Sequence, residues 1–419
     1  MSMMRSRRLC WLARVLGVFP LTERPAGEPV KPDAKINAVF PADAASAMPR
    51  SWTTDFSRKA RGDPGPKPML LERSAFWTCY SVLFVSVVLC ATVYCTLDDF
   101  FKGEAATGVR WTSRTDQYAT LCEYLSLCIS ALASAISACA FVGPVIRQAD
   151  LLAEVDALLG LPPPAPHRFL SLWLFVVLGV IVTDSSVWLV TGSNTVFDAL
   201  EDLPLYVTYY MCFTSEVLFM SDALAVKERI ASVNEILVSA MPPPGTLCVR
   251  RLAKAHAMLC EAMEAVSTRY GPPLAVDMVG VLLNLVITSY FSLEDLLPFS
   301  PPGDDGTLTF MEMVFAMLHL GRIVMLVEPG SSANREAERS AVLVGYLCST
   351  VPHGSLMYEQ LKAMSTQLHH QRPAFTHCGV IELDRSLIVS IVGSVTTYLL
   401  VLLQLKPTAI HDSHTNSTA

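Results

Sequence analysis

The chain has 419 residues, of which 52% are hydrophobic and only 16% are charged, and its mean hydropathy is +0.41. Soluble domains carry roughly 25% charged residues, so this composition indicates a membrane protein and excludes an ordinary soluble domain. The formal net charge of −7 decides little, because the distribution of charge along the chain carries the information on topology.

The N-terminal region, residues 1–72, is polar, rich in Pro and Ala, and basic. Arg14 interrupts its short apolar stretch and no small-residue cleavage site follows, so we predict a retained cytosolic segment with a short amphipathic helix rather than a signal peptide. The breaker cluster Asp63–Pro68 lies in a stretch, 22–68, that we expect to be poorly ordered.

Seven apolar runs follow, each about as long as a bilayer-spanning helix requires. The fifth run comes directly after Gly271-Pro272-Pro273, which is expected to separate it from the polar helix 250–269. The sixth is followed by a polar stretch, 328–378, which we expect to be a long loop. The expected spans within the 73–405 membrane domain are about 76–97, 118–142, 169–190, 204–226, 274–293, 308–327 and 380–405.

Lys and Arg are distributed unequally between the segments that join these spans. Of the 31, 26 lie on the side that holds the N-terminus and four on the other, while Arg322 lies inside the sixth span. Because positive residues favour the cytosolic side, we predict an all-α, seven-transmembrane-helix protein of the plasma membrane. Its N-terminus is cytosolic, and its tail, 406–419, is extracellular. The outer loops are acidic, which either concentrates cations or follows from the insertion rule alone.

Cysteine and histidine usage indicates neither a metal site nor a cofactor. The 12 Cys form no CxxC pair, and His369-His370 is an adjacent pair rather than a spaced ligand set. Cys95 and Cys122 fall near the same predicted extracellular level. They could therefore form a disulfide or remain as two separate thiols, and the sequence leaves both alternatives open. Asn416 begins a glycosylation sequon that would be extracellular.

Several functional classes lack their sequence motifs. There is no HExxH, P-loop, GxSxG or GxGxxG pattern, so we predict that the protein is not an enzyme. The sequence shows no internal repeat of the kind that is typical of secondary transporters, so we do not favour a transporter. G-protein-coupled receptors have an extracellular N-terminus, whereas the charge distribution here predicts a cytosolic one. The third span also lacks a DRY-type triplet and the seventh lacks an NPxxY motif, so we do not favour this class. A channel or an unusual receptor remains.

The seventh span carries a polar stripe although Leu387–Leu405 has no charged residue. At about 100° per residue, one narrow face holds Ser390, Ser394, Thr397, Val401 and Gln404. Such a face contacts other helices or water rather than lipid. Either several copies line a pore with it, Val401 forming an apolar ring, or the face packs inside a monomer with its hydroxyls bonded to backbone carbonyls.

The end of this span resembles a known family. The run with Thr397, Tyr398 and Gln404 resembles the TYhhhhhQF signature that closes the seventh helix of insect chemoreceptors, chiefly gustatory receptors. Leu405 stands where most gustatory receptors have Phe, and the ending VLLQLK is similar to that of the odorant receptor co-receptor. The stretch LARVLGVFPL resembles an N-terminal motif of the family, KERIASVNEIL its fourth-helix extension, and Phe375 with Gly379 and Leu383 the entry to its seventh helix.

The resemblance implies a gustatory-receptor-like, tetrameric, ligand-gated, non-selective cation channel. Its partners would be a small-molecule tastant, permeant cations, membrane lipid and related receptor subunits in a homo- or hetero-tetramer, with no nucleic acid. The gate would lie at Val401 and Leu405 around Gln404, and cytosolic helices at about 226–239, 250–269 and 340–368 would join the subunits. The alternative is a non-channel receptor or scaffold that signals through its cytosolic helices.

The resemblance also implies a ligand pocket within each subunit, in the outer half of the bundle formed by the second to sixth helices. An ionisable group inside a span is a functional candidate, although it can equally be one half of a satisfied interhelical hydrogen bond. The polar or aromatic candidates at suitable depth are Glu123, Asp184, Tyr209, Tyr210, Glu216, Asn284 and His319.

Overall fold

The computed structural model describes most of the predicted membrane domain and a short N-terminal segment. The described residues are 7–25, 69–102, 114–162, 167–191, 202–239, 246–296, 306–371, 374–377 and 381–405. Most of the stretch that we expect to be poorly ordered, the whole C-terminal tail with Asn416, and Gly379 of the family pattern lie outside them.

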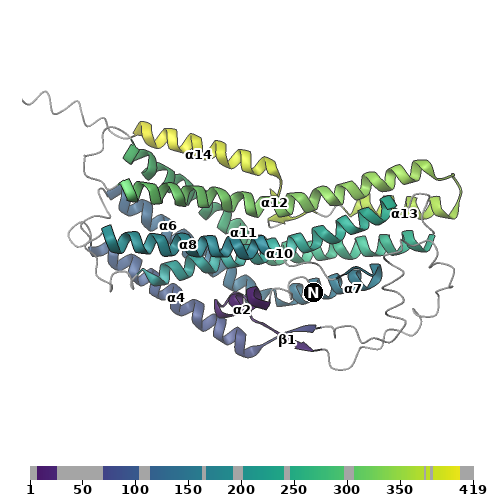
Figure 1. Ribbon diagram of the computed structural model, residues 1–419, viewed down its shortest axis with the longest axis horizontal. Coiled ribbons are helices and arrows are strands. Elements are labelled where there is room, and N and C mark those ends of the chain that lie inside the picture. Colours follow the sequence, from purple (N-terminus) through teal and green to yellow (C-terminus); the bar gives the residue numbers. More distant parts are fainter. Residues whose placement is uncertain are drawn as a thin grey trace, which may run out of the picture.

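Long helices run roughly along the long axis of the molecule (Figure 1). In chain order they are α4 (Ala75–Lys102), α6 (Arg114–Ala140), α7 (Val142–Leu159), α8 (Arg168–Thr191), α10 (Leu203–Ser239), α11 (Thr246–Leu296), α12 (Gly306–Thr350), α13 (Leu356–His370) and α14 (Arg385–Leu405). A short helix, α2 (Arg7–Val15), precedes them. Two small antiparallel strand pairs join β1 (Leu21–Pro25) to β2 (Met69–Arg73) and β3 (Thr376–His377) to β4 (Ile381–Glu382).

Five of the described helices, α4, α6, α8, α11 and α12, are long and apolar enough to cross a membrane. In α14 the apolar stretch is shorter, Arg385–Val401. Helix α10 is not among the five, and its position explains why. It packs against α4, α6, α8, α11 and α12, and Glu216 and Asp222 are buried in it. A helix surrounded by protein does not need a lipid-compatible surface.

The expected break before the fifth span is wrong, because α11 continues through Pro272 and Pro273. A proline has no N–H, so the carbonyl four residues before it loses its helical donor. For Pro273 that carbonyl belongs to Arg269, and the Ser137 hydroxyl of α6 donates a hydrogen bond to it. A neighbouring helix therefore supplies the missing donor, which allows the helix to continue.

The long loop expected at 328–378 is also wrong over most of its length, whereas helix is present over most of the 340–368 range that the family resemblance implied. Helix α12 continues through Pro329 to Thr350, and α13 occupies 356–370. The sequence is polar on average, but its buried residues recur at helical spacing: Ala333, Ala337, Ser340, Val344 and Leu347. This stretch is therefore an amphipathic helix whose buried face packs on its neighbours.

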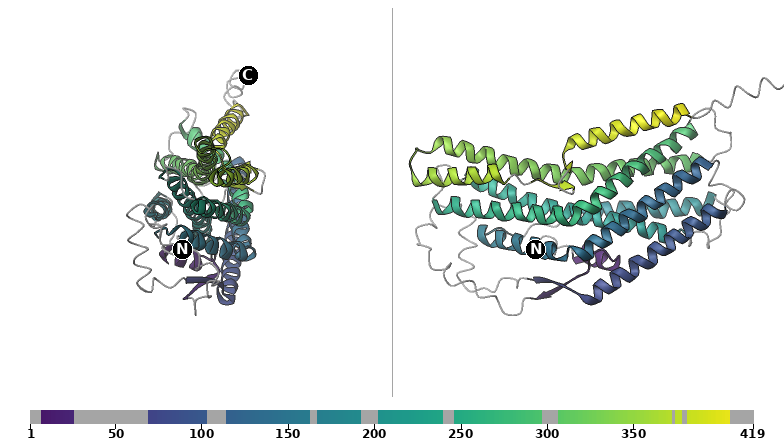
Figure 2. Two further views of the ribbon diagram at one scale, coloured as in Figure 1. Left: turned by 90° about the vertical axis from the view of Figure 1, so that its right-hand side faces the viewer. Right: turned by 180° about the vertical axis from the view of Figure 1, so that it is seen from behind.

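Helices α7 and α13, with the parts of α10, α11 and α12 that pack against them, form an extension of the bundle that we call the stem (Figures 1 and 2). Two polar contacts fasten it. Arg229 of α10 donates to both carboxylate oxygens of Asp156 on α7, at 2.8 and 2.7 Å. Asn234 donates to the Glu336 carbonyl of α12 at 2.8 Å and accepts from Ser340 at 2.7 Å. The Arg and Asn of KERIASVNEIL thus each hold a neighbouring stem helix.

We expect Asp156→Ala to lower the stability of the purified protein by about 3–5 kcal/mol, the usual result of removing one partner of a buried ion pair. The variant leaves Arg229 buried without a counter-charge. The matched control is Glu154→Ala on the same helix, because Glu154 pairs with Lys254 at the surface and such pairs contribute about 1 kcal/mol or less. Thermal unfolding in detergent measures both. Equal shifts in the two variants would contradict the assigned role of Arg229.

Cys122 is a free thiol in the structure, so the Cys95–Cys122 disulfide that the sequence left open is not formed.

Candidate functional site

The polar stripe of the seventh predicted span lies on an exposed face of α14. This helix runs along the edge of the molecule and packs on α11 and α12 (Figures 1 and 2). Ile391 and Val395 are buried against them. The stripe residues Ser390, Thr397, Val401 and Gln404 are exposed, and Ser394 is half-exposed. Tyr398 is also exposed, whereas the side chain of Leu405 lies outside the described ones.

The hydroxyl groups of the stripe bond to their own helix. Ser390 donates to the Ser386 carbonyl at 3.0 Å, and Ser394 donates to the Ser390 carbonyl at 2.9 Å. Thr397 donates to the Gly393 carbonyl, also at 2.9 Å. These bonds leave hydroxyl oxygens free to accept on a surface that the chain itself does not cover. The bonding matches the monomer interpretation of the stripe, but the face is exposed instead of packed inside the chain.

A cluster of charged side chains is buried inside the bundle where α10, α11 and α12 meet. Arg322 of α12 donates through Nε to Glu216 Oε1 of α10 at 3.0 Å. Its Nη2 donates to the same carboxylate and to Asp277 Oδ1 of α11 at 3.1 Å. The Arg322 side chain is only 1% exposed. One guanidinium therefore joins three helices, which a dry interior tolerates only when the charges are paired.

Aromatic groups complete the surroundings of Arg322. Its guanidinium lies 4.4 Å from the ring centre of Phe213 and 5.5 Å from that of Tyr209. His319 lies between Arg322 and Tyr209. Its Nδ1 is 3.5 Å from Arg322 Nη1, and its Nε2 is 3.3 Å from the Tyr209 hydroxyl. The Oε2 atom of Glu216 has no hydrogen-bond partner among the described residues.

The seven candidate pocket residues do not form one group. Tyr209, Glu216 and His319 converge on Arg322, as described above. Asn284 accepts from Ser126 across α6 and α11 at 3.2 Å, and Asp184 accepts from Tyr206 across α8 and α10 at 2.6 Å. The remaining two, Glu123 and Tyr210, are partly buried.

Sequence reasoning missed Arg322 and Asp277 as members of the cluster. The signal was present, because each is a charged residue inside a predicted span, where an ionisable side chain needs a partner. Spacing along the chain could not identify that partner, since the three charges come from three different helices.

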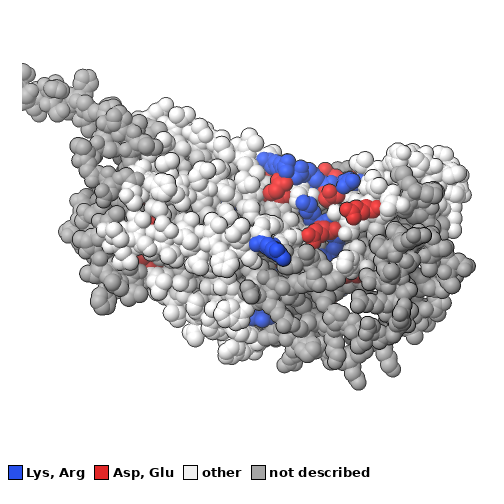
Figure 3. Space-filling model, in the orientation of Figure 1, with Lys and Arg blue, Asp and Glu red and all other residues white. Residues whose placement is uncertain are grey.

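The start of α14 is fastened to α12 by a second polar group, which we call the joint. Arg385 donates to both oxygens of Glu328 at 2.9 and 2.6 Å, and Arg335 donates to the same carboxylate at 3.2 Å. The joint is exposed. Charged side chains gather on this face of the molecule about midway along it, where α12 meets the start of α14 (Figure 3).

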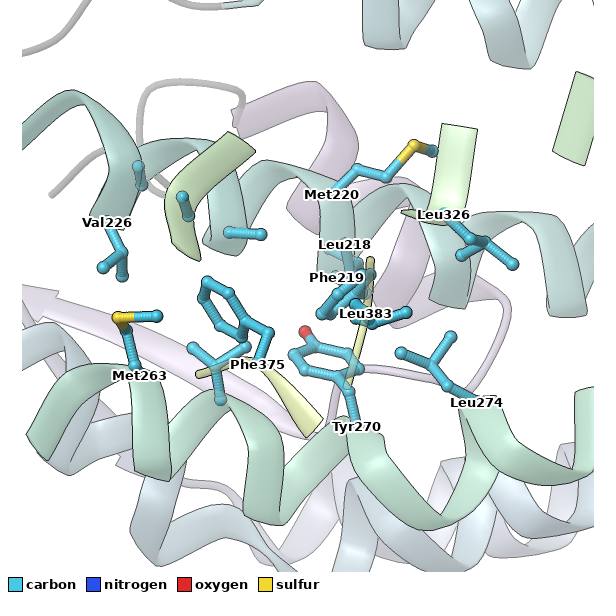
Figure 4. Close-up of a cluster of buried hydrophobic side chains, with 14 of the residues drawn as sticks. Leu218, Phe219, Met220, Val226, Met263, Tyr270, Leu274, Leu326, Phe375 and Leu383 are labelled. Atoms are coloured by element: carbon cyan, nitrogen blue, oxygen red, sulfur yellow. The ribbon is translucent and has the colours of Figure 1, made fainter. Parts of the chain in front are cut away.

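Beneath the joint, the segment before α14 is inserted into the core. Phe375 packs among buried side chains of α10 and α11, close to Tyr270 and Phe219 (Figure 4). The Leu383 amide donates to the Phe375 carbonyl at 3.0 Å. Leu383 lies so close to Gly330 of α12 that a Cβ there would be 2.8 Å from it. The position of α14 is therefore tied to the packing of this cluster.

Comparison with known proteins supplies the family. The model of the 7tm chemosensory receptor family matches residues 53–408. The chain is 30% identical over 162 residues to the gustatory receptor for sugar taste 43a of Drosophila melanogaster, and 28% identical over 167 residues to the putative gustatory receptor 28b of that species. Each alignment covers 39% of this chain, but only 37% and 35% of the two relatives. The matches thus span little more than a third of these relatives.

Among solved structures, the fold is similar to that of the insect olfactory receptor OR5 from Machilis hrabei. The TM-score is 0.57 at 14% sequence identity, with 95% of this chain and 97% of that chain covered. The structure of the same receptor in complex with eugenol gives a TM-score of 0.52, also at 14% identity. At this identity the similarity shows the fold alone.

Proposed function

Because the chain belongs to the 7tm chemosensory receptor family, we propose that it is a gustatory-receptor-like, ligand-gated, non-selective cation channel. In this proposal four subunits place their α14 helices around one axis. The ligand is a small-molecule tastant, and the subunits are copies of this chain or related receptors. The likeness of the fold to an insect olfactory receptor structure supports the helical architecture that this proposal requires.

The observation that carries the channel proposal is the exposed polar face of α14. A helix in a membrane protein has no reason to expose a line of hydroxyl and amide groups to lipid. The line Ser390, Ser394, Thr397 and Gln404 would become a water-compatible wall when copies of the helix surround an axis. Val401, within this line, would add an apolar ring that stops water and ions when the pore is narrow.

The ligand would bind within each subunit, away from α14. Interior polar groups on α6, α8, α10, α11 and α12 support this part of the proposal, because a mostly apolar site with a few fixed polar groups is typical of small-molecule binding. Tyr209 and His319 are the candidates that we favour, since both lie inside the bundle and next to a charged cluster. Hydroxyl and imidazole groups suit a polar ligand.

We propose that the N-terminus and the stem are cytosolic and that the C-terminus is extracellular, in the plasma membrane. The unequal distribution of Lys and Arg supports this orientation. Subunits would then associate through the stem. The exposed joint between α12 and the start of α14 would lie at the cytosolic membrane surface.

Cysteine substitution on α14 tests the channel proposal. In cells that express the full chain, a charged thiol reagent should block the ligand-evoked current of Ser394→Cys and Val401→Cys. The matched control is Thr396→Cys, because Thr396 is also exposed but lies about 100° or more from both stripe positions around the helix. Unsubstituted protein controls for the native thiols. Equal block at all three positions would contradict the role of the stripe as the pore wall, and ligand binding without any current would favour the non-channel receptor.

A further inference from the structure

Within the N-terminal segment, most side chains between residues 9 and 21 pack into the bundle. Leu9, Cys10 and Ala13 of α2 are buried, and so are Val18 and Phe19 after it. Because side chains 9, 10 and 13 fall on one helical face, the apolar face of α2 is fully used against its own chain. Trp11, which points the other way, is 61% exposed.

Specific contacts fix where this segment sits. The Tyr80 hydroxyl of α4 donates to the Val15 carbonyl at 2.8 Å, and Arg14 Nε donates to the Leu21 carbonyl at 2.6 Å. Between them Gly17 has φ of 73°, a conformation that favours glycine. A Cβ on Gly17 would lie 3.1 Å from Val85 of α4. The turn is therefore held closely against the first long helix.

Phe19, at the end of this turn, faces a buried arginine of α11. The Arg269 guanidinium lies 5.7 Å from the centre of the Phe19 ring and 4.7 Å from that of Tyr270. Arg269 is buried, and its Nη1 has no hydrogen-bond partner among the described residues. The two aromatic faces are thus major neighbours of this cation, an arrangement that is favourable when the charge is desolvated.

A continuous row of contacts leads from Arg269 to the start of α14. The Tyr270 ring packs edge-on against Phe219 of α10 at 5.7 Å, and its hydroxyl donates to Asp222 at 3.1 Å. Phe219 packs edge-on against Phe375 at 6.1 Å. Phe375 in turn accepts the amide hydrogen bond of Leu383, two residues before α14 begins. Figure 4 shows Tyr270, Phe219, Phe375 and Leu383 in one cluster.

From this row of contacts we propose that the N-terminal segment positions α14. Phe19 is a positioning residue that keeps Arg269 against Tyr270, and so holds the cluster into which Phe375 and Leu383 insert. Helices α2 and α14 lie on opposite sides of the molecule (Figure 1), so the effect on α14 is indirect. For the channel, this inference rests on the proposed function: loss of the Phe19 ring should change the ligand concentration that opens the pore.

Hydrogen–deuterium exchange of the purified full chain tests the structural part without any current. Phe19→Ala should speed exchange several-fold in peptides that contain Phe375 and Leu383, and leave α13 unchanged. The matched control is Trp11→Ala, an aromatic truncation in the same segment at an exposed position, which should change neither region. Phe19→Leu keeps an apolar side chain but removes the ring. If Phe19→Ala does not fold, Phe19→Leu gives the same test, with a smaller increase at Phe375.

The outcomes separate the two proposals. Exchange near Phe375 and Leu383 that stays unchanged in Phe19→Leu overturns the positioning role, whatever the currents show. Faster exchange there, with a shifted half-maximal ligand concentration, supports it. Faster exchange without ligand-evoked current from either the variant or the unsubstituted protein supports the positioning role and counts against the channel proposal alone.

Discussion

Arg322→Met is expected to remove most of the folded receptor from the cell surface. The substitution fills the same space with an apolar side chain but leaves Glu216 and Asp277 buried without their shared partner. Removing one member of a buried charge group costs about 3–5 kcal/mol, which is a large part of the 5–15 kcal/mol by which proteins are usually stable. Surface biotinylation and thermal unfolding in detergent measure the loss.

Two further variants show whether charge is the cause. Arg335→Met, on the same helix but with an exposed side chain, should leave surface expression unchanged. The triple variant Glu216→Gln, Asp277→Asn and Arg322→Met removes every formal charge of the cluster and should recover much of the lost stability. Failure of the triple variant to do better than Arg322→Met would mean that the size and shape of the arginine, and not its charge, hold the three helices.

Val401→Ser is expected to raise the current that flows without ligand. In the proposed pore Val401 supplies the apolar ring of a closed gate, and an apolar constriction excludes ions because it does not hold water. A hydroxyl at this position would hydrate the constriction. Voltage clamp of cells that express the variant, at matched surface expression, should show a leak several-fold above that of the unsubstituted chain.

The control for this variant is its neighbour on the same helix. Leu400 is also exposed but is turned by about 100° from Val401 around the helix axis, so Leu400→Ser should not raise the leak. A similar leak from both variants would indicate general loosening of α14, and no leak from either would place the gate elsewhere.

The membrane character and the polar stripe could be predicted from the sequence because both are local patterns. Apolar runs of span length and a 100° repeat are properties of consecutive residues, and α14 exposes the face that the repeat defines. The Arg322 cluster could not be predicted as a cluster, because its members are brought together only when three helices pack. The stripe also could not reveal its own environment, since a polar face suits a water-filled pore and a helix interface equally well.

The wrong predictions share one physical cause. Pro272 and Pro273 are strong local signals for a break, and both lie inside a helix. Tertiary contacts outweighed the local signal. Pro273 cannot donate a hydrogen bond to the Arg269 carbonyl, and the Ser137 hydroxyl of α6 donates one instead. Similarly, the polar stretch after the sixth span contained a buried helical face that average hydropathy concealed. Propensity is a weak guide where neighbouring helices can supply the missing contacts.

The unbroken course of α11 has a mechanical consequence. At 1.5 Å per residue, its 51 residues form one continuous helix whose contour length is about 75 Å, and the Ser137 bond joins it to α6 beside the two prolines. Because the backbone is helical on both sides of the prolines, the part of α11 inside the bundle and its part in the stem are coupled without an intervening loop. A change in packing deep in the bundle would therefore be transmitted along α11 to the stem.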